Sequence, residues 1–267
     1  MKEISEEATV TTLPKGYRAY KIKGVEQTII AKKGGPSSEE VKVKGSYQEL
    51  RNNQKEFAVA SMMAKVLRSS LSEGMAEICE TYVSGKLTAQ FRNLAKQEQG
   101  QTGTRPMCIS KHGHLLNGFE FNPEAPYNKI FDAKYYVKPG SRLGQVILHF
   151  PAFVPEKVFD NPEEATNFKI NARLVALSDF KFDAHSGSYQ PLNEELHGCY
   201  SSYESPMLPL MRIPTEPMTA QVSLSNVSEM SKDIGFFLVM AVSFYRYDKG
   251  QFTHLARHSG MHIHKVY

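Results

Sequence analysis

The stretch IGFFLVMAVSFY, residues 234–245, is the longest apolar run in this chain of 267 residues. A helix that crosses a membrane needs about 20 consecutive apolar residues, so this run is too short to be one. A shorter apolar run of this kind is typical of a strand buried in a protein core. We therefore expect a buried strand here and no membrane-spanning segment or membrane partner.

Turn signals surround this strand and divide the second half of the chain into short segments. They include Asn117-Gly118, KPGSRLG at 138–144, and Asp248-Lys249-Gly250, where we expect a hairpin. A long irregular crossing is expected in the proline-rich stretch ESPMLPLMRIPTEPM at 204–218. Several short strands with a turn every ~8–12 residues predict a β-sandwich.

Upstream, from about Ser46 to Gly100, the hydrophobic period changes to that of helices. Apolar residues recur at spacings of three and four, which places them on one helix face. The expected stripe consists of Phe57, Ala60, Met63 or Ala64, Leu67, Leu71, Ile78, Tyr82 or Val83, Leu87, Phe91 and Leu94. We expect two or three helices, with a bend at Gly74, a break near residues 84–86, and a polar linker over 96–106.

The N-terminal region predicts a two-stranded ribbon. YRAYKIKG at 17–24 and EQTIIAKKG at 26–34 have strand composition, and GGPSS ends the second strand. The fold class is therefore α+β, with a basic β-ribbon and helical segment followed by a mostly antiparallel β-sandwich. The expected division is a flexible tail at 1–13, the ribbon arm plus helical segment at 14–100, and a β-sandwich-like domain at 101–267.

Positive charge is concentrated in the N-terminal part of the chain. Residues 14–70 hold twelve Lys or Arg and five Glu, an excess larger than the net charge of +4 of the whole chain. A basic arm suits a polyanion, an acidic patch on a sister subunit, or simply a solvated surface. The candidate residues for polyanion or subunit contact are Lys15, Arg18, Lys21, Lys23, Lys32, Lys33, Lys42 and Lys44.

The familiar catalytic and cofactor motifs are absent from the sequence. The lysines of AKKGG precede the glycines, so the stretch is no phosphate-binding loop, and GxGxxG, GxSxG and CxxC do not occur. The three cysteines, Cys79, Cys108 and Cys199, are scattered and odd in number, which argues against a disulfide framework. We expect idle thiols. We expect a non-enzymatic protein without a cofactor.

Four histidines near the C-terminus form the strongest candidate for a metal site. They are His254, His258, His262 and His264. On strands only His262 and His264 share a face, and no nearby Asp or Glu completes a ligand set. We assign no metal to them and interpret them as core or surface histidines, with metal binding left open as an alternative.

Several segments resemble a family of proteins of unknown function that is common in Bacteroidota genomes. The similarity includes the ribbon with its Lys-Gly-Gly segment and the pattern R-x-N-x-x-E-F, here Arg51, Asn53, Glu56 and Phe57. It extends to LLNGFEFN at 115–122, PAFVP at 151–155, ATNFKI at 165–170 and FFLVMAVSFYRYDKGQF at 236–252. The resemblance implies a two-part protein with a β-rich C-terminal domain and no secretion signal, and it supplies no catalytic residues.

These observations together predict a structural protein that assembles with copies of itself. The arm from about Tyr17 to Lys44 would reach a neighbour, and the sandwich would form the other contacts of a homo-oligomer or lattice. The alternative is a nucleic-acid-binding protein whose basic arm contacts phosphates. No apolar signal-peptide region follows the first lysine, so we expect a cytoplasmic protein, and membership of a larger particle stays open.

Overall fold

The computed structural model describes residues 13–22, 26–225, 227 and 231–267 of the chain. The chain forms two units, Met1–Arg51 and Asn52–Tyr267, and each is described by itself. The predicted tail at 1–13, apart from Leu13, and the candidate residue Lys23 lie outside the described residues.

The apolar run at 234–245 is a buried strand, as predicted. It belongs to β11 (Ile234–Asp248), which pairs antiparallel with β5 (Asn167–Ser178). The pairing extends from Ile234 opposite Ser178 to Tyr245 opposite Asn167. The strand is buried on both faces because alternate side chains enter two different cores. Phe237, Val239 and Ala241 enter the first core, and Phe236, Leu238 and Met240 enter the second.

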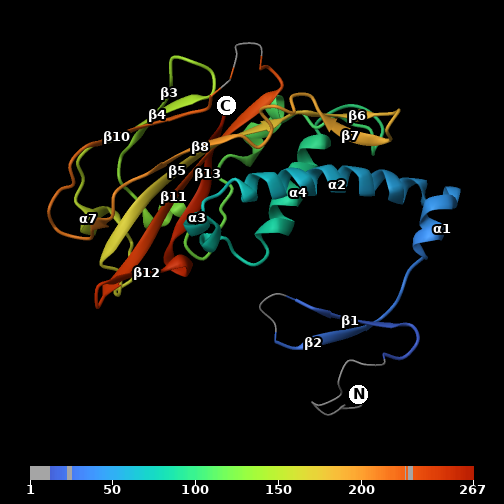
Figure 1. The fold of residues 1–267 in the computed structure, drawn as a ribbon, viewed down its shortest axis with the longest axis horizontal. Coiled ribbons are helices and arrows are strands. Elements are labelled where there is room, and N and C mark those ends of the chain that lie inside the picture. The colour runs from blue at the N-terminus through green and yellow to red at the C-terminus, as the bar shows by residue number, and fades with distance from the viewer. Residues whose placement is uncertain (1–12, 23–25, 226, 228–230) are drawn as a thin grey trace. The chain divides into compact units, whose positions relative to one another are not determined.

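The β5–β11 pair is the centre of a six-stranded sheet (Figure 1). Along this sheet the order is β12, β11, β5, β8, with β13 also pairing β11 and β9 pairing β5. The added strands are β12 (Gln251–His254), β8 (Tyr200–Glu204), β13 (Gly260–Val266) and β9 (Leu208–Pro209). The predicted hairpin joins β11 to β12, and Lys249 and Gly250 form its turn with φ angles of 48° and 86°.

Helices cover one face of this sheet. They are α2 (Gln48–Ser69), α3 (Glu73–Ile78) and α4 (Val83–Ala95), and their buried residues share the first core with the sheet. A three-stranded sheet packs on the other face in the order β10, β4, β3 and shares the second core. Its strands are β10 (Met218–Ser223), β4 (Gln145–Phe150) and β3 (Tyr136–Pro139), so the predicted strands around KPGSRLG are present.

Shorter elements connect these layers (Figure 1). The helices are α5 (Ile109–His112), α6 (Tyr127–Ile130) and α7 (Pro155–Val158), with 3-10 turns η2 (Gly113–Leu116) and η3 (Ala256–His258). β6 (Phe180–Asp183) and β7 (Ser188–Pro191) form a separate hairpin. None of the helices formed by the described residues is both long and apolar enough to cross a membrane.

The α+β class with mostly antiparallel sheets is confirmed, but the division of the chain differs from the predicted one. The two units divide after Arg51, whereas the sequence analysis placed the division between residues 100 and 101. The reason is that α2, α3 and α4 bury their apolar face against the sheet and form one core with it. Periodicity shows that a helix has an apolar face, but it does not identify the surface that covers this face.

The helical stripe differs from the predicted one at Phe57. This residue is 54% exposed, and the residue before it, Glu56, is buried instead. Of the two alternatives Tyr82 and Val83, Val83 is the buried one. Gly74, where a bend was expected, lies within α3, after a break that has already ended α2 at Ser69. The buried residues from Ala60 to Leu71 and from Val83 to Leu94 otherwise follow the prediction.

The first unit is small. It contains β1 (Tyr17–Lys21), β2 (Thr28–Lys32), α1 (Ser38–Val43) and the 3-10 turn η1 (Gly45–Tyr47), and α2 starts at its end. β1 and β2 pair antiparallel, from Tyr17 opposite Lys32 to Lys21 opposite Thr28. Among its described residues, 13–22 and 26–51, none is buried.

Candidate functional site

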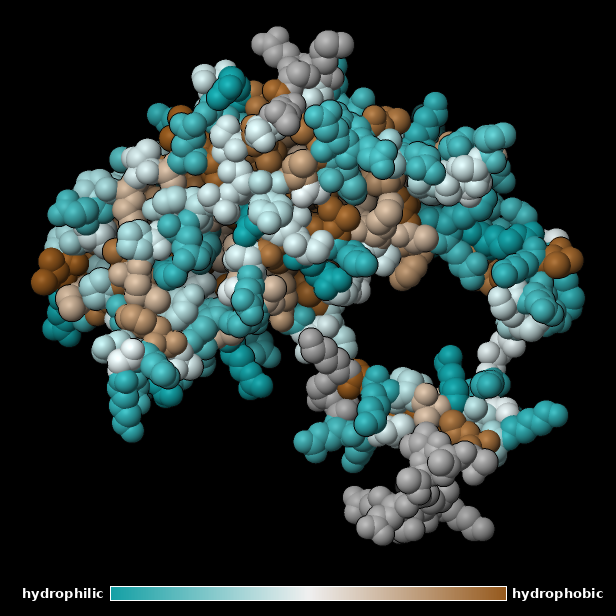
Figure 2. All heavy atoms as spheres, in the orientation of Figure 1, coloured by the Kyte–Doolittle hydropathy of each residue, from teal (hydrophilic) through white to brown (hydrophobic). Residues whose placement is uncertain are grey.

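The β1–β2 ribbon is the strongest candidate for a functional surface, because its apolar side chains are exposed. Tyr17 is 41% exposed, Tyr20 43% and Ile30 60%. Brown apolar surface is visible among the teal polar surface of this ribbon in Figure 2. A two-stranded hairpin without a covering surface is at best marginally stable in water.

Register determines which side chains share a face of the ribbon. Residues opposite each other in an antiparallel pair point to the same face, and neighbours in one strand point to opposite faces. One face therefore carries Tyr17, Ala19, Lys21, Thr28, Ile30 and Lys32. The other carries Arg18, Tyr20, Ile29 and Ala31, and the guanidinium carbon of Arg18 lies 5.7 Å from the ring centroid of Tyr20.

The main chain of the ribbon has two edges to which no strand among the described residues pairs. The N–H of Lys33 donates to the carbonyl of Gly16 at 2.6 Å, which fixes the phase of the hydrogen bonds along the ladder. Because bonded pairs alternate in an antiparallel ladder, Thr28, Ile30 and Lys32 direct their N–H and C=O groups away from β1. The outer edge of β2 is thus a row of polar groups that another strand can satisfy.

The candidate cations are brought only partly together. Arg18 lies on one face of the ribbon, whereas Lys21 and Lys32 lie on the other face and at opposite ends of it. Lys15 and Lys33 flank the strands and are exposed, and Lys23 is outside the described residues. Lys42 is in the last turn of α1, and the ammonium of Lys44 pairs with Glu40 at 2.6 Å. The ribbon therefore has no single basic face.

The sequence analysis missed helix α1, which follows the ribbon. The hydroxyl of Ser37 accepts from the N–H of Glu40 at 3.1 Å, and the Glu40 carboxylate accepts from the N–H of Ser37 at 3.0 Å. This is a capping box, and the pattern S-x-x-E at 37–40 was the signal that could have revealed the helix. Hydrogen bonds, first from Lys44 and then from Ser37, lower the pKa of Glu40.

Arg51 ties the end of α1 to the start of α2. Its Nη1 donates to the carbonyls of Val41 at 2.6 Å and Lys44 at 2.9 Å, and its Nη2 donates to Gln48 at 2.5 Å. Carbonyls at a helix C-terminus lack partners within the helix, and a cation there is favourable. Arg51, the first residue of the R-x-N-x-x-E-F pattern, therefore has a structural role.

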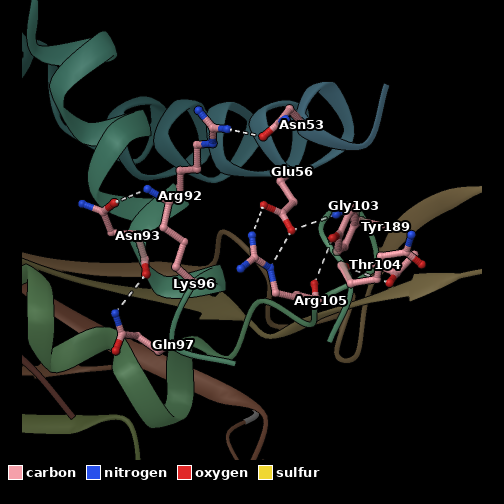
Figure 3. Close-up of polar contacts among 11 residues, drawn as sticks. Asn53, Glu56, Arg92, Asn93, Lys96, Gln97, Gly103, Thr104, Arg105 and Tyr189 are labelled. Atoms are coloured by element: carbon pink, nitrogen blue, oxygen red, sulfur yellow. Dashed lines mark hydrogen bonds and ion pairs between the residues drawn. The ribbon is translucent and has the colours of Figure 1, made fainter. Parts of the chain in front are cut away.

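The next polar residues of that pattern form a clamp in the second unit (Figure 3). Asn53 accepts a hydrogen bond of 2.6 Å from Nη2 of Arg92 on α4. Glu56 accepts three hydrogen bonds, from Nε and Nη2 of Arg105 at 2.8 Å each and from the N–H of Gly103 at 2.9 Å. The hydroxyl of Tyr189 on β7 donates to the carbonyl of Arg105 at 2.9 Å. The clamp joins α2 to α4, the 100–105 loop and the β6–β7 hairpin.

The charge of Glu56 is stabilised inside this clamp. Burial by itself raises the pKa of a carboxyl group, but the hydrogen bonds from Arg105 and Gly103 outweigh it and lower the pKa of Glu56. The side chain is 1% exposed and both oxygens are occupied by donors. A carboxylate that is enclosed in this way and bonded at both oxygens is not accessible to a substrate, so we interpret the clamp as structural.

The C-terminal histidines do not converge on a metal site. Among the described residues no group of three or more His, Cys, Asp or Glu side chains is placed to hold a metal ion. His258 is exposed, whereas His262 is 3% exposed and stacks on Tyr127 with a centroid distance of 4.0 Å. Nδ1 of His264 lies 3.3 Å from the hydroxyl of Tyr135.

His262 is the most unusual of the four histidines. Neither of its ring nitrogens has a hydrogen-bond partner among the described residues. Burial, and then the neighbouring His264, lowers the pKa of His262 to about 3. The ring is therefore neutral at physiological pH and acts as an aromatic core residue.

His254 takes part in a chain of contacts that resembles a catalytic triad. Its Nδ1 lies 2.6 Å from a carboxylate oxygen of Glu77, and its Nε2 lies 3.3 Å from the hydroxyl of Ser259. Ser259 is 0% exposed, and its hydroxyl donates to the carbonyl of Leu255 at 2.9 Å and accepts from the N–H of Phe244 at 3.0 Å. A nucleophile must be reached by its substrate, and this hydroxyl is enclosed. The chain of contacts ties α3 to β12 and to the residue between η3 and β13.

The cysteines also lack the features of reactive thiols. All three are free, and burial is the main cause that raises the pKa of Cys79 and of Cys108 to about 11. Because the thiolate is the nucleophilic form, both are unreactive at neutral pH. Cys199 is exposed on the loop before β8.

Comparison with known proteins adds no family. No family model matches the chain, and no curated protein matches it at a significant level. The function proposed next therefore depends on the geometry of the chain itself.

Proposed function

We propose that this chain is a non-enzymatic structural protein that assembles with copies of itself. The ribbon with α1 serves as an arm, and the two packed sheets with their helical cover serve as a β-sandwich body. The observation that carries the proposal is a ribbon with exposed Tyr17, Tyr20 and Ile30 and an open β2 edge, in a unit without a buried residue among those described.

Stability supports this proposal. A two-stranded ribbon becomes independently stable when further strands or a covering surface bury one of its faces. Complete burial of a side chain the size of Ile or Tyr contributes about 1.5–3 kcal/mol, and Ile30 is 60% exposed without a partner. A neighbouring copy supplies both missing elements, apolar cover and main-chain partners.

The polar residues of the body support the same proposal. Glu56, Arg105 and Arg92 bond to groups within the chain, and so do His254 and Ser259. These contacts connect helices, loops and hairpins to one another. Polar side chains that bond to other parts of the same chain make the body rigid, as a structural subunit requires.

Nucleic-acid binding is the competing function, and the geometry of the ribbon supports it less well. Phosphate contacts need cations that follow one surface, as on a basic groove or stripe. Here Arg18 lies on the face opposite Lys21 and Lys32, and Lys44 is paired with Glu40. The aromatic residues of the arm are divided as well, because Tyr17 and Tyr20 lie on opposite faces.

The test compares the full chain with a variant that lacks residues 1–45. Both are treated with nuclease and measured by size-exclusion chromatography with light scattering at low and high salt. We expect an oligomer for the full chain and a folded monomer for the deletion variant, with unchanged near-UV circular dichroism of the body. A matched variant, Lys32→Glu with Lys33→Glu, keeps the arm and should remain oligomeric.

Two results would contradict the proposal. An oligomer of unchanged mass after the deletion would mean that the arm makes no assembly contact. A monomeric full chain that carries nucleic acid until salt removes it, and that loses it in the Lys32→Glu, Lys33→Glu variant, would establish the competing function.

A further inference from the structure

The outer edge of β2 matches a second copy of itself. Thr28, Ile30 and Lys32 direct their main-chain groups to this edge, and Ile30 is the middle residue of the strand. Two identical strands can pair antiparallel about a two-fold axis when the central residue of each directs its N–H and C=O to the other. β2 meets this condition at Ile30.

We propose that β2 of one copy pairs antiparallel with β2 of a second copy about a two-fold axis at Ile30. The product is a four-stranded sheet in the order β1, β2, β2, β1. This inference rests on the proposed function and identifies the surface and the partner that the arm uses.

The opposing side chains are compatible in this register. Ile30 opposes Ile30 of the second copy, and Thr28 opposes Lys32, so no two cations are directly opposite.

The opposite face of the joined sheet gains an apolar strip. Ile29 opposes Ala31 of the second copy, and within each ribbon Tyr20 already opposes Ile29. Each row across the four strands then holds Tyr20 and Ile29 of one copy and Ala31 and Arg18 of the other, and the two Ile29 side chains are diagonal neighbours at the centre. A sheet of four strands with an apolar face meets the condition for stability that a single ribbon lacks.

The outer edge of β1 is a poorer choice for pairing. The N–H of Tyr17, which this edge would offer to a neighbour, already donates to the carbonyl of Pro14 at 3.0 Å. No contact of this kind engages Thr28, Ile30 or Lys32 among the hydrogen bonds of the described residues. Within the described part of the chain, the β2 edge is therefore the one whose outward main-chain groups are not engaged.

The register can be tested by disulfide cross-linking of the full-length protein. Cys199 is exposed, so a Cys199→Ser background removes its contribution. In the proposed pair the two Cα atoms of residue 30 are about 5.5 Å apart, which is within the range that a disulfide bridges. Ile30→Cys should therefore give a covalent dimer on a non-reducing gel after mild oxidation.

Two further positions make the test specific for the register. Residue 28 of one copy opposes residue 32 of the other, and the two copies of residue 28 are about 13 Å apart. Thr28→Cys or Lys32→Cys alone should give little dimer, whereas a mixture of the two proteins should cross-link. Val43→Cys, which is 83% exposed on α1, controls for random collision.

The outcomes separate this inference from the proposed function. An oligomer that depends on residues 1–45 but gives no more dimer with Ile30→Cys than with Val43→Cys would overturn the register and leave the proposed function standing. Equal cross-linking of Thr28→Cys alone and Ile30→Cys would also overturn it. A full chain that is monomeric in every condition would overturn both.

Discussion

Both carboxylate oxygens of Glu56 accept hydrogen bonds of 2.8 Å from Arg105, a residue 49 positions further along the chain. The pair is buried on the Glu56 side, with 1% of that side chain exposed and 15% of the Arg105 side chain. A buried charge without its partner is costly, whereas the intact pair contributes little net stability. The pair therefore determines where the 100–105 loop attaches to α2.

Removing the carboxylate of Glu56 should destabilise the second unit. We expect Glu56→Ala to lower the free energy of unfolding by about 3–5 kcal/mol, because Arg105 loses its partner in a mostly buried site. Urea unfolding followed by circular dichroism measures the loss. Glu194→Ala, on an exposed loop, is the control and should change stability by less than about 0.5 kcal/mol. Equal stability of both variants would contradict the role of the clamp.

Gly103 should not tolerate a side chain. Its φ is 92°, and a Cβ atom there would lie 2.7 Å from the Cα of Asn52. Gly187 has a φ of 68° but nothing within 4 Å of the corresponding position, so it is a matched control. We expect about 1 kcal/mol of destabilisation for Gly187→Ala, from the backbone alone. Gly103→Ala should lose clearly more in the same unfolding measurement, and a smaller loss would be inconsistent with the close contact.

Acid should destabilise the second unit through His262. Its pKa is lowered to about 3 in the folded protein and is near 6.5 in the unfolded chain, so protons bind the unfolded state more readily. The contribution is absent above pH 6.5 and grows as the pH falls toward 3, by at most about 1.4 kcal/mol per pH unit. His262→Phe keeps an aromatic ring on Tyr127 and removes the proton acceptor.

The His262→Phe variant should equal or exceed the wild type in stability at pH 7 and lose less stability on acidification. Thermal unfolding at pH 7.5, 6, 5 and 4 gives both curves. His258→Phe, at an exposed histidine, is the control and should follow the wild type. Parallel wild-type and His262→Phe curves would show that His262 does not become protonated on unfolding.

Ser259 should act as a structural residue. A fluorophosphonate probe, which reacts with activated serine hydroxyls, should leave the protein unlabelled because the hydroxyl is enclosed. Ser259→Ala removes the hydrogen bonds to the N–H of Phe244 and the carbonyl of Leu255 and the contact with Nε2 of His254, and should cost about 1–3 kcal/mol. Labelling of the wild type that Ser259→Ala abolishes would instead identify a hydrolase.

Much of the second unit could be predicted from local sequence. The apolar run at 234–245 identified the central strand, and Asp248-Lys249-Gly250 identified its hairpin. Helix positions from Ala60 to Leu71 followed from periodicity, but the burial of Glu56 did not. That burial depends on Arg105, and no local pattern connects two residues 49 positions apart.

The candidate surface was predictable only in part. Composition located the cations of the arm, but their distribution over two faces depends on the pairing of Tyr17 with Lys32. The bond from Lys33 to Gly16 determines which residues of β2 direct their main-chain groups away from β1. Amino-acid composition does not reveal this hydrogen-bond pattern. The boundary after Arg51 was missed because it depends on which surface covers the helices.

The turn that engages the N–H of Tyr17 with the carbonyl of Pro14 has a consequence for how far strand pairing can proceed. Once two ribbons join through β2, only the two β1 edges remain exposed. A further strand would meet an amide that is already occupied and a proline three residues before it, both of which discourage edge-to-edge growth. Strand addition through these arms would therefore be self-limiting and would end in a closed pair instead of an amyloid-like fibre.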